Sequence, residues 1–295
     1  MIPIKDGRFK SFDDVEIYYE LRGEGPPVVY CYGIGCLFNH FHEQVQFFSN
    51  QYQTLMFDYR GHQQSSSPED PAEMTIENIA QDLIGLLDHL GIEKASFVGH
   101  SFGGQVLIET YRKRPDLFSN IVFINGFVDN PIRDMFGSDI PSQLFDVLKG
   151  SHDLLPKTVD FLFKKTVGNP IAAPISAFLG GFNLNLTAYK DIEIYTKALS
   201  GMDLDAFLAL FEKMMKYDGK PYLSEIEVPC LVIAGLQDAV TPLHHQKLLA
   251  ESLKHGELAE IPYGSHCTHL DLPEYVNLRI DKFYHATGFA DTRAR

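Results

Sequence analysis

The residues with the clearest chemical meaning are a serine, an aspartate and two histidines. Ser101 lies at the centre of a G-x-S-x-G pattern that runs from Gly99 to Gly103, between a strand-like apolar segment and a helical pattern. Glycines two positions to either side allow a sharp, strained turn that lifts the hydroxyl above the strand end. Ser101 is therefore a candidate nucleophile, with a glycine-rich helix start packed on a strand as the alternative interpretation of the motif.

A serine hydroxyl needs a base, and the base needs a group that orients it. Asp238 follows an apolar segment, within the pattern G-x-x-D-x-x-T-P, and is a candidate orienting acid. His266 and His269 follow the last strand-like segment, within G-x-H-x-x-H-L-D-x-P-E. Asp129, which also follows a strand-like segment, is an alternative acid, and His269 is an alternative base.

The elements that would position these residues alternate along the chain. Apolar segments predict strands at 15–21, 27–32, 53–57, 95–98, 121–124, 228–234 and 258–262, the first as part of an N-terminal hairpin. Between them, residues 76–90 keep apolar side chains at helical spacing, with Thr75 as N-cap and Gly91 as a stop. This alternation predicts an α/β fold with a mostly parallel central sheet covered by helices on both faces.

Residues 130–222 interrupt the alternation. Helical patterns follow one another there at 142–149, 153–167, 187–199 and 203–216, with no strand between them. We therefore expect a helical insert at 130–222 in a core formed by 1–129 and 223–295. Phe207 and Phe211 belong to an apolar stripe on the last of these helices and are candidates to line a substrate pocket.

Composition excludes several classes of protein. The 295 residues include 25 Lys and Arg against 39 Asp and Glu, a net charge of −14, which argues against a nucleic-acid partner. No apolar run approaches the roughly 18 residues of a membrane span, and the first residues lack the pattern of a signal peptide. The 4 cysteines show neither a disulfide framework nor zinc-ligand spacing. We expect a cytoplasmic protein without a bound metal.

Taken together, the motifs resemble those of the α/β-hydrolase-fold superfamily, in particular its capped, carboxylesterase-like serine hydrolases. The serine, aspartate and histidine segments occur in the family's order, and Asp58 to His62 resemble its D-x-R-G-H loop. The similarity covers nearly the whole chain, with the 130–222 insert where the family carries a helical lid. The resemblance implies Ser101 as nucleophile, His266 as general base and Asp238 as its orienting acid.

The resemblance also implies an oxyanion hole made by two backbone N–H groups, those of Ile34 and Phe102. The sequence departs from the family pattern at two positions nearby. Tyr32-Gly33 stands where the family has His-Gly, and Gln63 stands where it has glycine. Neither departure removes a backbone donor or a catalytic group.

These features predict hydrolysis of small to medium, uncharged, moderately hydrophobic carboxylic esters through an acyl-enzyme, without a cofactor. Serine rather than aspartate at the turn argues against dehalogenase and epoxide-hydrolase chemistry. A cofactor-free haloperoxidase or perhydrolase and an acyltransferase stay open, and so does a carbon–carbon bond hydrolase, although His100 before the nucleophile argues against it. A small-molecule receptor with slow turnover is the alternative outside enzymes. The sequence leaves the oligomeric state open.

Overall fold

A single mixed sheet forms the centre of the protein. The computed structural model describes residues 2–169, 175, 177, 179 and 181–291. Within them, an 8-stranded sheet has the order β1-β2-β4-β3-β5-β6-β7-β8. β1, β2 and β4 pair antiparallel, and the other neighbours are parallel. The strands are β1 (Ile4–Lys10), β2 (Glu16–Arg22), β3 (Pro27–Cys31), β4 (Gln53–Phe57), β5 (Ala95–His100), β6 (Phe118–Ile124), β7 (Cys230–Gly235) and β8 (Gly256–Ile261). The predicted α/β fold is confirmed.

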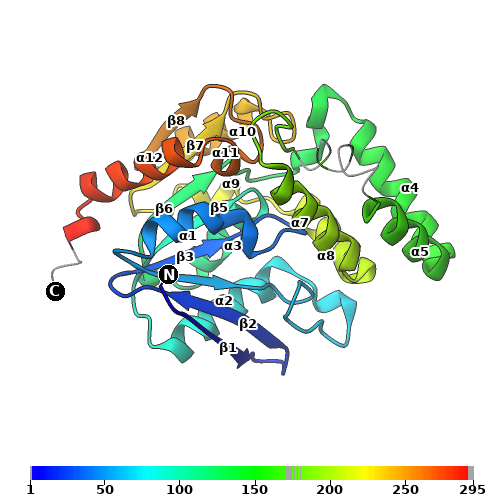
Figure 1. Cartoon of the computed structure of the whole chain (residues 1–295), viewed down its shortest axis with the longest axis horizontal. Helices are drawn as coiled ribbons and strands as arrows, with labels where there is room; N and C mark the ends of the chain where they lie inside the picture. The colour runs from blue at the N-terminus through cyan, green and yellow to red at the C-terminus, as the bar shows by residue number, and fades with distance from the viewer. Residues whose placement is uncertain (1, 170–174, 176, 178, 180, 292–295) are drawn as a thin grey trace.

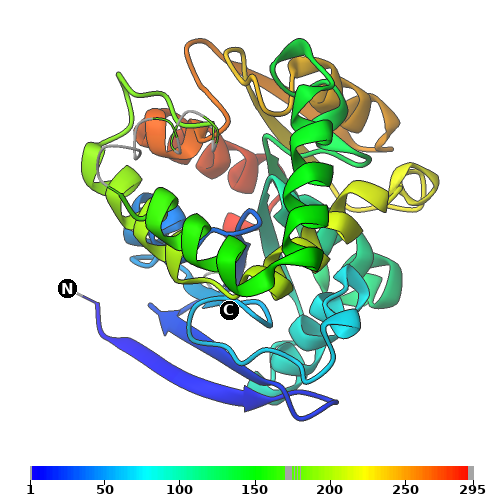
Figure 2. The same cartoon turned by 90° about the vertical axis from the view of Figure 1, so that its right-hand side faces the viewer.

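Helices cover both faces of this sheet (Figures 1 and 2). On one face α1 contacts α12, and on the other α2 contacts α3. The helices outside 130–219 are α1 (His42–Phe48), α2 (Ile76–Leu90), α3 (Phe102–Lys113), α9 (Lys220–Leu223), α10 (Leu243–Ser252), α11 (Thr268–Asp271) and α12 (Pro273–Ala286). Short 3-10 turns are η1 (Phe38–Phe41), η2 (Pro71–Glu73) and η3 (Pro115–Leu117). Among the described residues, no helix combines the length and hydropathy that crossing a membrane requires.

Four helices between β6 and β7 lie together beyond one end of the sheet (Figures 1 and 2). They are α4 (Ile140–Leu154), α5 (Pro156–Val167), α7 (Tyr189–Gly201) and α8 (Leu204–Lys216), preceded by η4 (Pro131–Arg133) and η5 (Met135–Gly137). The predicted boundary between the first two helices was wrong, because α4 continues to Leu154. The break comes at Leu155, whose φ of −138° is outside the helical region because Pro156 follows it.

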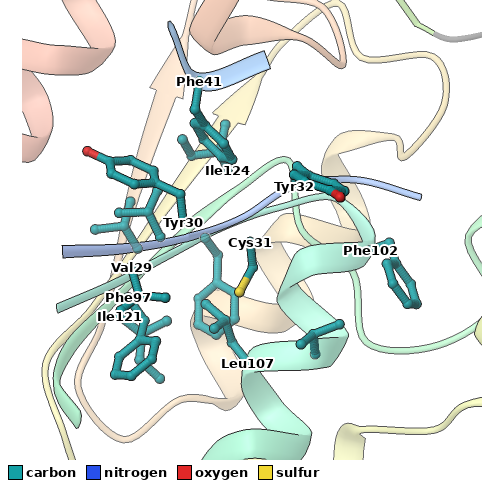
Figure 3. Close-up of a cluster of buried hydrophobic side chains, with 14 of the residues drawn as sticks. Val29, Tyr30, Cys31, Tyr32, Phe41, Phe97, Phe102, Leu107, Ile121 and Ile124 are labelled. Atoms are coloured by element: carbon teal, nitrogen blue, oxygen red, sulfur yellow. The ribbon is translucent and has the colours of Figure 1, made fainter. Parts of the chain in front are cut away.

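The core explains why the strands are almost continuously apolar. β3, β5, β6 and β7 are covered on both sides, and nearly all of their side chains are buried. Figure 3 shows the centre of this cluster, where Val29 and Tyr30 of β3 pack with Phe97, Ile121 and other buried side chains. Helix α2 begins and ends as its sequence predicts, with the Thr75 hydroxyl accepting from the N–H of Asn78 and Gly91 in the left-handed region at φ +67°.

One fully buried arginine ties the N-terminal hairpin to the rest of the fold. Arg60 makes two parallel hydrogen bonds of 2.7 Å to the carboxylate of Asp82 in α2. It also donates to Asp13 in the β1–β2 turn at 2.8 Å, and Ser11 donates to Asp82 at 2.5 Å. The paired carboxylates compensate for the removal of the guanidinium from water.

Replacing Arg60 by leucine should therefore destabilise the protein strongly, by about 3–5 kcal/mol, because it leaves Asp82 buried without its partner. Urea unfolding followed by circular dichroism measures the change. Arg114→Ala, which breaks an exposed pair with Asp116, is the matched control and should cost no more than about 1 kcal/mol. Equal losses in the two variants would contradict the importance of the buried pair.

Candidate active site

The turn that carries Ser101 has the strained geometry that its glycines predict. Ser101 lies between β5 and α3 with φ +54° and ψ −121°, and its N–H donates to the carbonyl of Ile124 at 3.0 Å. A β-carbon at Gly103 would lie 2.0 Å from the carbonyl oxygen of Cys31, and one at Gly99 would lie 2.8 Å from Leu107. Side chains at these two positions would therefore force the turn apart.

The structure brings the predicted serine, histidine and aspartate into one hydrogen-bonded line. The Nε2 atom of His266 is 2.9 Å from the hydroxyl oxygen of Ser101, and its Nδ1 atom is 2.8 Å from Oδ2 of Asp238. The three residues are 4–7% exposed. Ser101 precedes α3, Asp238 follows β7, and His266 follows β8, so all three lie at the carboxyl edge of the parallel strands, where open α/β sheets bind ligands.

The carboxylate of Asp238 is held by four hydrogen bonds. Its Oδ1 atom accepts from the N–H groups of Val240 and Thr241, at 2.9 and 2.8 Å. Its Oδ2 atom accepts from the hydroxyl of Thr241 at 2.7 Å and faces His266. With these contacts the carboxylate cannot rotate away from the imidazole, which is the geometry that an orienting acid requires.

The two alternative residues lie elsewhere. Asp129 faces Nδ1 of His245 at 3.4 Å and binds Lys220 at 2.8 Å, and these partners hold the pKa of its carboxyl below the usual range. His269 packs against the ring of His100, at a centroid distance of 4.4 Å, and its burial lowers its pKa far below the usual value. Neither side chain makes a hydrogen bond to Ser101 among the described contacts.

A small group of potential metal ligands surrounds the first turn of α10. Asp134, His244 and His245 each place one ligand atom within 4.8 Å of the others. The sequence places no carboxylate near these histidines, and the fold brings one there. The ammonium group of Lys220 and the positive end of α10 lie beside the same cluster, and both oppose a bound cation. We therefore interpret these as polar contacts between the start of α10 and the loop after β6.

The backbone N–H groups of Ile34 and Phe102, which the sequence predicts as donors to an oxyanion, belong to two residues near Ser101. Phe102 is the first residue of α3, directly after Ser101, and Ile34 lines the same cavity as Ser101. In the described part of the chain, neither N–H group donates to another residue. Next to Ile34, the N–H of Gly35 is already used, since it donates to Nε2 of His62 at 3.2 Å.

The structure explains both departures from the family pattern. The hydroxyl of Tyr32 donates to Asp58 at 3.0 Å and accepts from the N–H of Tyr59, so the turn after β3 is anchored without a histidine. Burial raises the pKa of Asp58 to about 7. Gln63 adopts φ +43°, the left-handed conformation that glycine would take, and its amide donates to the carbonyl of Cys36 at 3.3 Å. This contact adds an anchor on the turn that carries Ile34.

An apolar cavity of about 120 Å³ opens onto Ser101 and His266. Leu179, Tyr195, Phe207, Phe211 and Met214 of the segment between β6 and β7 line the same cavity as the serine. No lysine, arginine, aspartate or glutamate is among its described lining residues. The cavity therefore favours an uncharged ligand with apolar groups.

Cys36 and Cys267 also line this cavity, and both are buried. Burial raises the pKa of both thiols, so they stay protonated at neutral pH. Protonated thiols are poor nucleophiles and behave as small apolar side chains. They fill space beside the serine.

Sequence analysis missed two residues of the site. Thr241 belongs to the G-x-x-D-x-x-T-P pattern, which gave it no role beyond a turn, yet its hydroxyl contacts both Asp238 and, at 3.2 Å, Nδ1 of His266. Asn125 follows β6 at φ +47° and donates to the loop that carries His266. The one feature of the sequence that pointed to Asn125 was its position directly after a predicted strand, at the carboxyl edge of the sheet.

Comparisons with known proteins agree with this architecture. A family model described as alpha/beta hydrolase fold matches residues 26–273. A protein of Azorhizobium caulinodans named carbamate hydrolase RutD is 24% identical over 266 residues, which cover 90% of this chain and 93% of that protein. The 3-oxoadipate enol-lactonase 2 of Acinetobacter baylyi is 26% identical over 272 residues, covering 91% of this chain and 92% of its own.

Solved structures show the same fold. A thermophilic esterase from Thermogutta terrifontis superposes with a TM-score of 0.75 at 20% identity, covering 96% of this chain and 99% of its own. At this identity the likeness concerns the fold alone.

Buried histidines around the site should make stability fall in mild acid. Desolvation lowers the pKa of His40 and that of His62 to about 4, against about 6.5 for a free side chain. Between these values only the unfolded chain takes up the protons, so the free energy of unfolding falls as the pH drops from about 6.5 to 4. Each histidine should contribute on the order of 3 kcal/mol to this fall.

Replacing His40 by phenylalanine should reduce the slope of the unfolding free energy against pH by the equivalent of about one proton. The exchange breaks no described hydrogen bond, because both ring nitrogens of His40 lack a partner. Denaturant unfolding at a series of pH values measures the slope, with His255→Gln at an exposed site as the control. An unchanged slope in the His40 variant would show that this ring is already protonated in the folded protein.

Proposed function

The chain belongs to the alpha/beta hydrolase fold family, and on that premise we propose that it is a serine hydrolase of uncharged, moderately hydrophobic carboxylic esters. The main support for the proposal is the chain of hydrogen bonds from Ser101 through His266 to Asp238, with contacts of 2.9 and 2.8 Å. Ser101 and His266 line an apolar cavity. A buried serine hydroxyl with a base and an oriented acid behind it is the arrangement that acyl transfer requires.

In the proposed mechanism, Nε2 of His266 takes the proton of Ser101 as its oxygen attacks the ester carbonyl. The N–H groups of Ile34 and Phe102 hold the negative charge on the carbonyl oxygen, a contribution of typically 10²–10³ in rate for each donor. His266 then gives its proton to the departing alcohol, which leaves an acyl group on Ser101. A water molecule, activated by the same histidine, releases the acid and restores the hydroxyl.

The lining of the cavity supports an uncharged substrate. A carboxylate or ammonium group on the substrate would find no opposite charge among the described lining residues, and its desolvation would oppose binding. The names of two relatives refer to a carbamate and a lactone, whose hydrolysis also begins at a carbonyl carbon. These compounds belong in the test panel beside simple esters.

We further propose that residues 130–222 act as a lid whose inner side chains select the substrate. Phe207 and Phe211 support this role, because they line the same cavity as Ser101 and pack on each other with centroids 5.6 Å apart. A lid over the serine would exclude water and strengthen the contacts to the oxyanion.

Ser101→Ala should lower kcat for p-nitrophenyl acetate by several orders of magnitude without lowering the melting temperature, because it removes the nucleophile and only one buried hydroxyl. A fluorophosphonate should label the wild type at Ser101 and leave the variant unlabelled. Ser96→Ala in β5, the strand that precedes Ser101, is the control, since it removes a buried hydroxyl bonded to Asn120 and Tyr284 and should affect stability more than turnover.

Near-normal turnover by the Ser101 variant would exclude this mechanism. Melting shifts with carbonyl ligands but almost no turnover by the wild type would favour a receptor. Turnover that disappears after EDTA dialysis and returns with one divalent ion would contradict the cofactor-free mechanism.

Replacing Phe207 or Phe211 by alanine should move the preferred acyl chain to greater length, because it enlarges the cavity that Ser101 lines. We expect kcat/KM to change severalfold for long p-nitrophenyl esters and little for the acetate. Phe163→Ala, which removes a ring from the same apolar cluster but not from the cavity, is the control. Equal loss on every ester, in step with the melting temperature, would mean that these rings only stabilise the helices.

A further inference from the structure

Asn125 uses every polar group it has, and all of its contacts lead to segments that carry the triad. Its N–H donates to the carbonyl of Ile233 in β7 at 2.8 Å, and its side-chain oxygen accepts from the N–H of Gly235 at 2.9 Å. Its amide nitrogen donates to the carbonyls of Ser265 and His266, at 2.5 and 2.7 Å. The residue is fully buried.

The backbone carbonyls of Ile124 and Asn125 contact the segments that carry Ser101 and Asp238. The carbonyl oxygen of Asn125 lies 3.3 Å from the hydroxyl oxygen of Thr241, whose single proton is donated to Asp238 at 2.7 Å. The preceding carbonyl, of Ile124, accepts the N–H of Ser101 at 3.0 Å. Residues 124 and 125 thus touch the backbone or side chains of all three triad segments.

From these contacts we infer that Asn125 is a positioning residue, whose carboxamide sets where the imidazole of His266 lies relative to Ser101 and Asp238. The inference rests on the proposed serine hydrolase mechanism. The loop that carries His266 has no regular secondary structure between β8 and α11, and the carbonyls of Ser265 and His266 accept from side-chain donors. Asn125 supplies them from the end of a central strand, and Nε2 of His100 adds one more, to the carbonyl of His266 at 2.9 Å.

The backbone conformation makes asparagine suitable for this place. At φ +47° a residue with a β-carbon is strained, and asparagine tolerates the left-handed region better than most. Glycine tolerates it too but brings no carboxamide. Aspartate keeps the shape but turns both side-chain oxygens into acceptors, which would face the carbonyls of Ser265 and His266 and repel them.

The test compares Asn125→Gly and Asn125→Asp with Asn120→Asp. Asn120 is a matched control, because it lies on β6, the strand that precedes Asn125, is also buried, and has its described side-chain hydrogen bond with Ser96, away from the triad. For p-nitrophenyl acetate, both Asn125 variants should lose about 10²-fold in kcat with KM changed less than about threefold, since a misplacement of about 1 Å can have that effect. After correction for the folded fraction, Asn120→Asp should keep kcat within about threefold of the wild type.

Two readouts separate positioning from general damage. Fluorophosphonate labelling of Ser101 should slow in parallel with kcat in the Asn125 variants. In NMR spectra, the Nδ1 proton of His266, assigned with His266→Gln, should move upfield in Asn125→Gly because the ring loses its fixed contact with Asp238. Loss of kcat only in proportion to the folded fraction, or a raised KM with unchanged kcat, would overturn the inference.

Failure of the proposed function gives a different result. Wild-type protein that neither hydrolyses any ester nor reacts with the fluorophosphonate would refute the serine hydrolase, whatever the Asn125 variants do. The NMR spectra still test the inference in that case, since they need no turnover. An unchanged signal of the His266 Nδ1 proton in Asn125→Gly would overturn it.

Discussion

The arrangement at the catalytic edge depends on one contact, the 2.9 Å between Nε2 of His266 and the hydroxyl of Ser101. These two residues lie at the ends of different strands and are 165 positions apart. The strained turn after β5 fixes one end of the contact, and the loop after β8 fixes the other. The parallel sheet holds both ends in place, because β5, β6, β7 and β8 are neighbours in register. A change in any of these pairings would separate the serine from its base.

Two different environments meet at this contact. On one side of it, four hydrogen bonds hold the carboxylate of Asp238. On the other side the cavity is apolar, and the buried thiols of Cys36 and Cys267 are neutral. A carboxylate with these partners costs less to bury, whereas the charge that would form on a substrate oxygen in the proposed reaction finds few competing dipoles. This division suits a reaction in which charge appears only in the transition state.

The local parts of this site could be predicted from sequence, and the long-range parts could not. The turn at Ser101 and the cap at Thr75 follow from residues within four positions of each other, so short patterns reveal them. The contacts of Arg60 with Asp82 and Asp13 join three separate segments, and no spacing rule connects them. Asn125 is similar, because its partners lie 108 to 143 positions away. The predicted boundary between α4 and α5 was wrong for a simpler reason. It was based on apolar spacing, which does not show that the first helix continues until just before Pro156.

The edge of the sheet and the helices between β6 and β7 contribute different kinds of side chain to the cavity. The edge of the sheet contributes the hydrogen-bonded groups, and each of them is fixed by several partners, so a substitution there disturbs its neighbours. The helices between β6 and β7 contribute apolar side chains such as Phe207 and Met214, which contact the cavity mainly through shape. Apolar contacts are nondirectional and tolerate exchange for others of similar volume. Exchanges of these side chains can therefore alter the shape of the cavity while the contacts of Ser101, His266 and Asp238 keep their geometry.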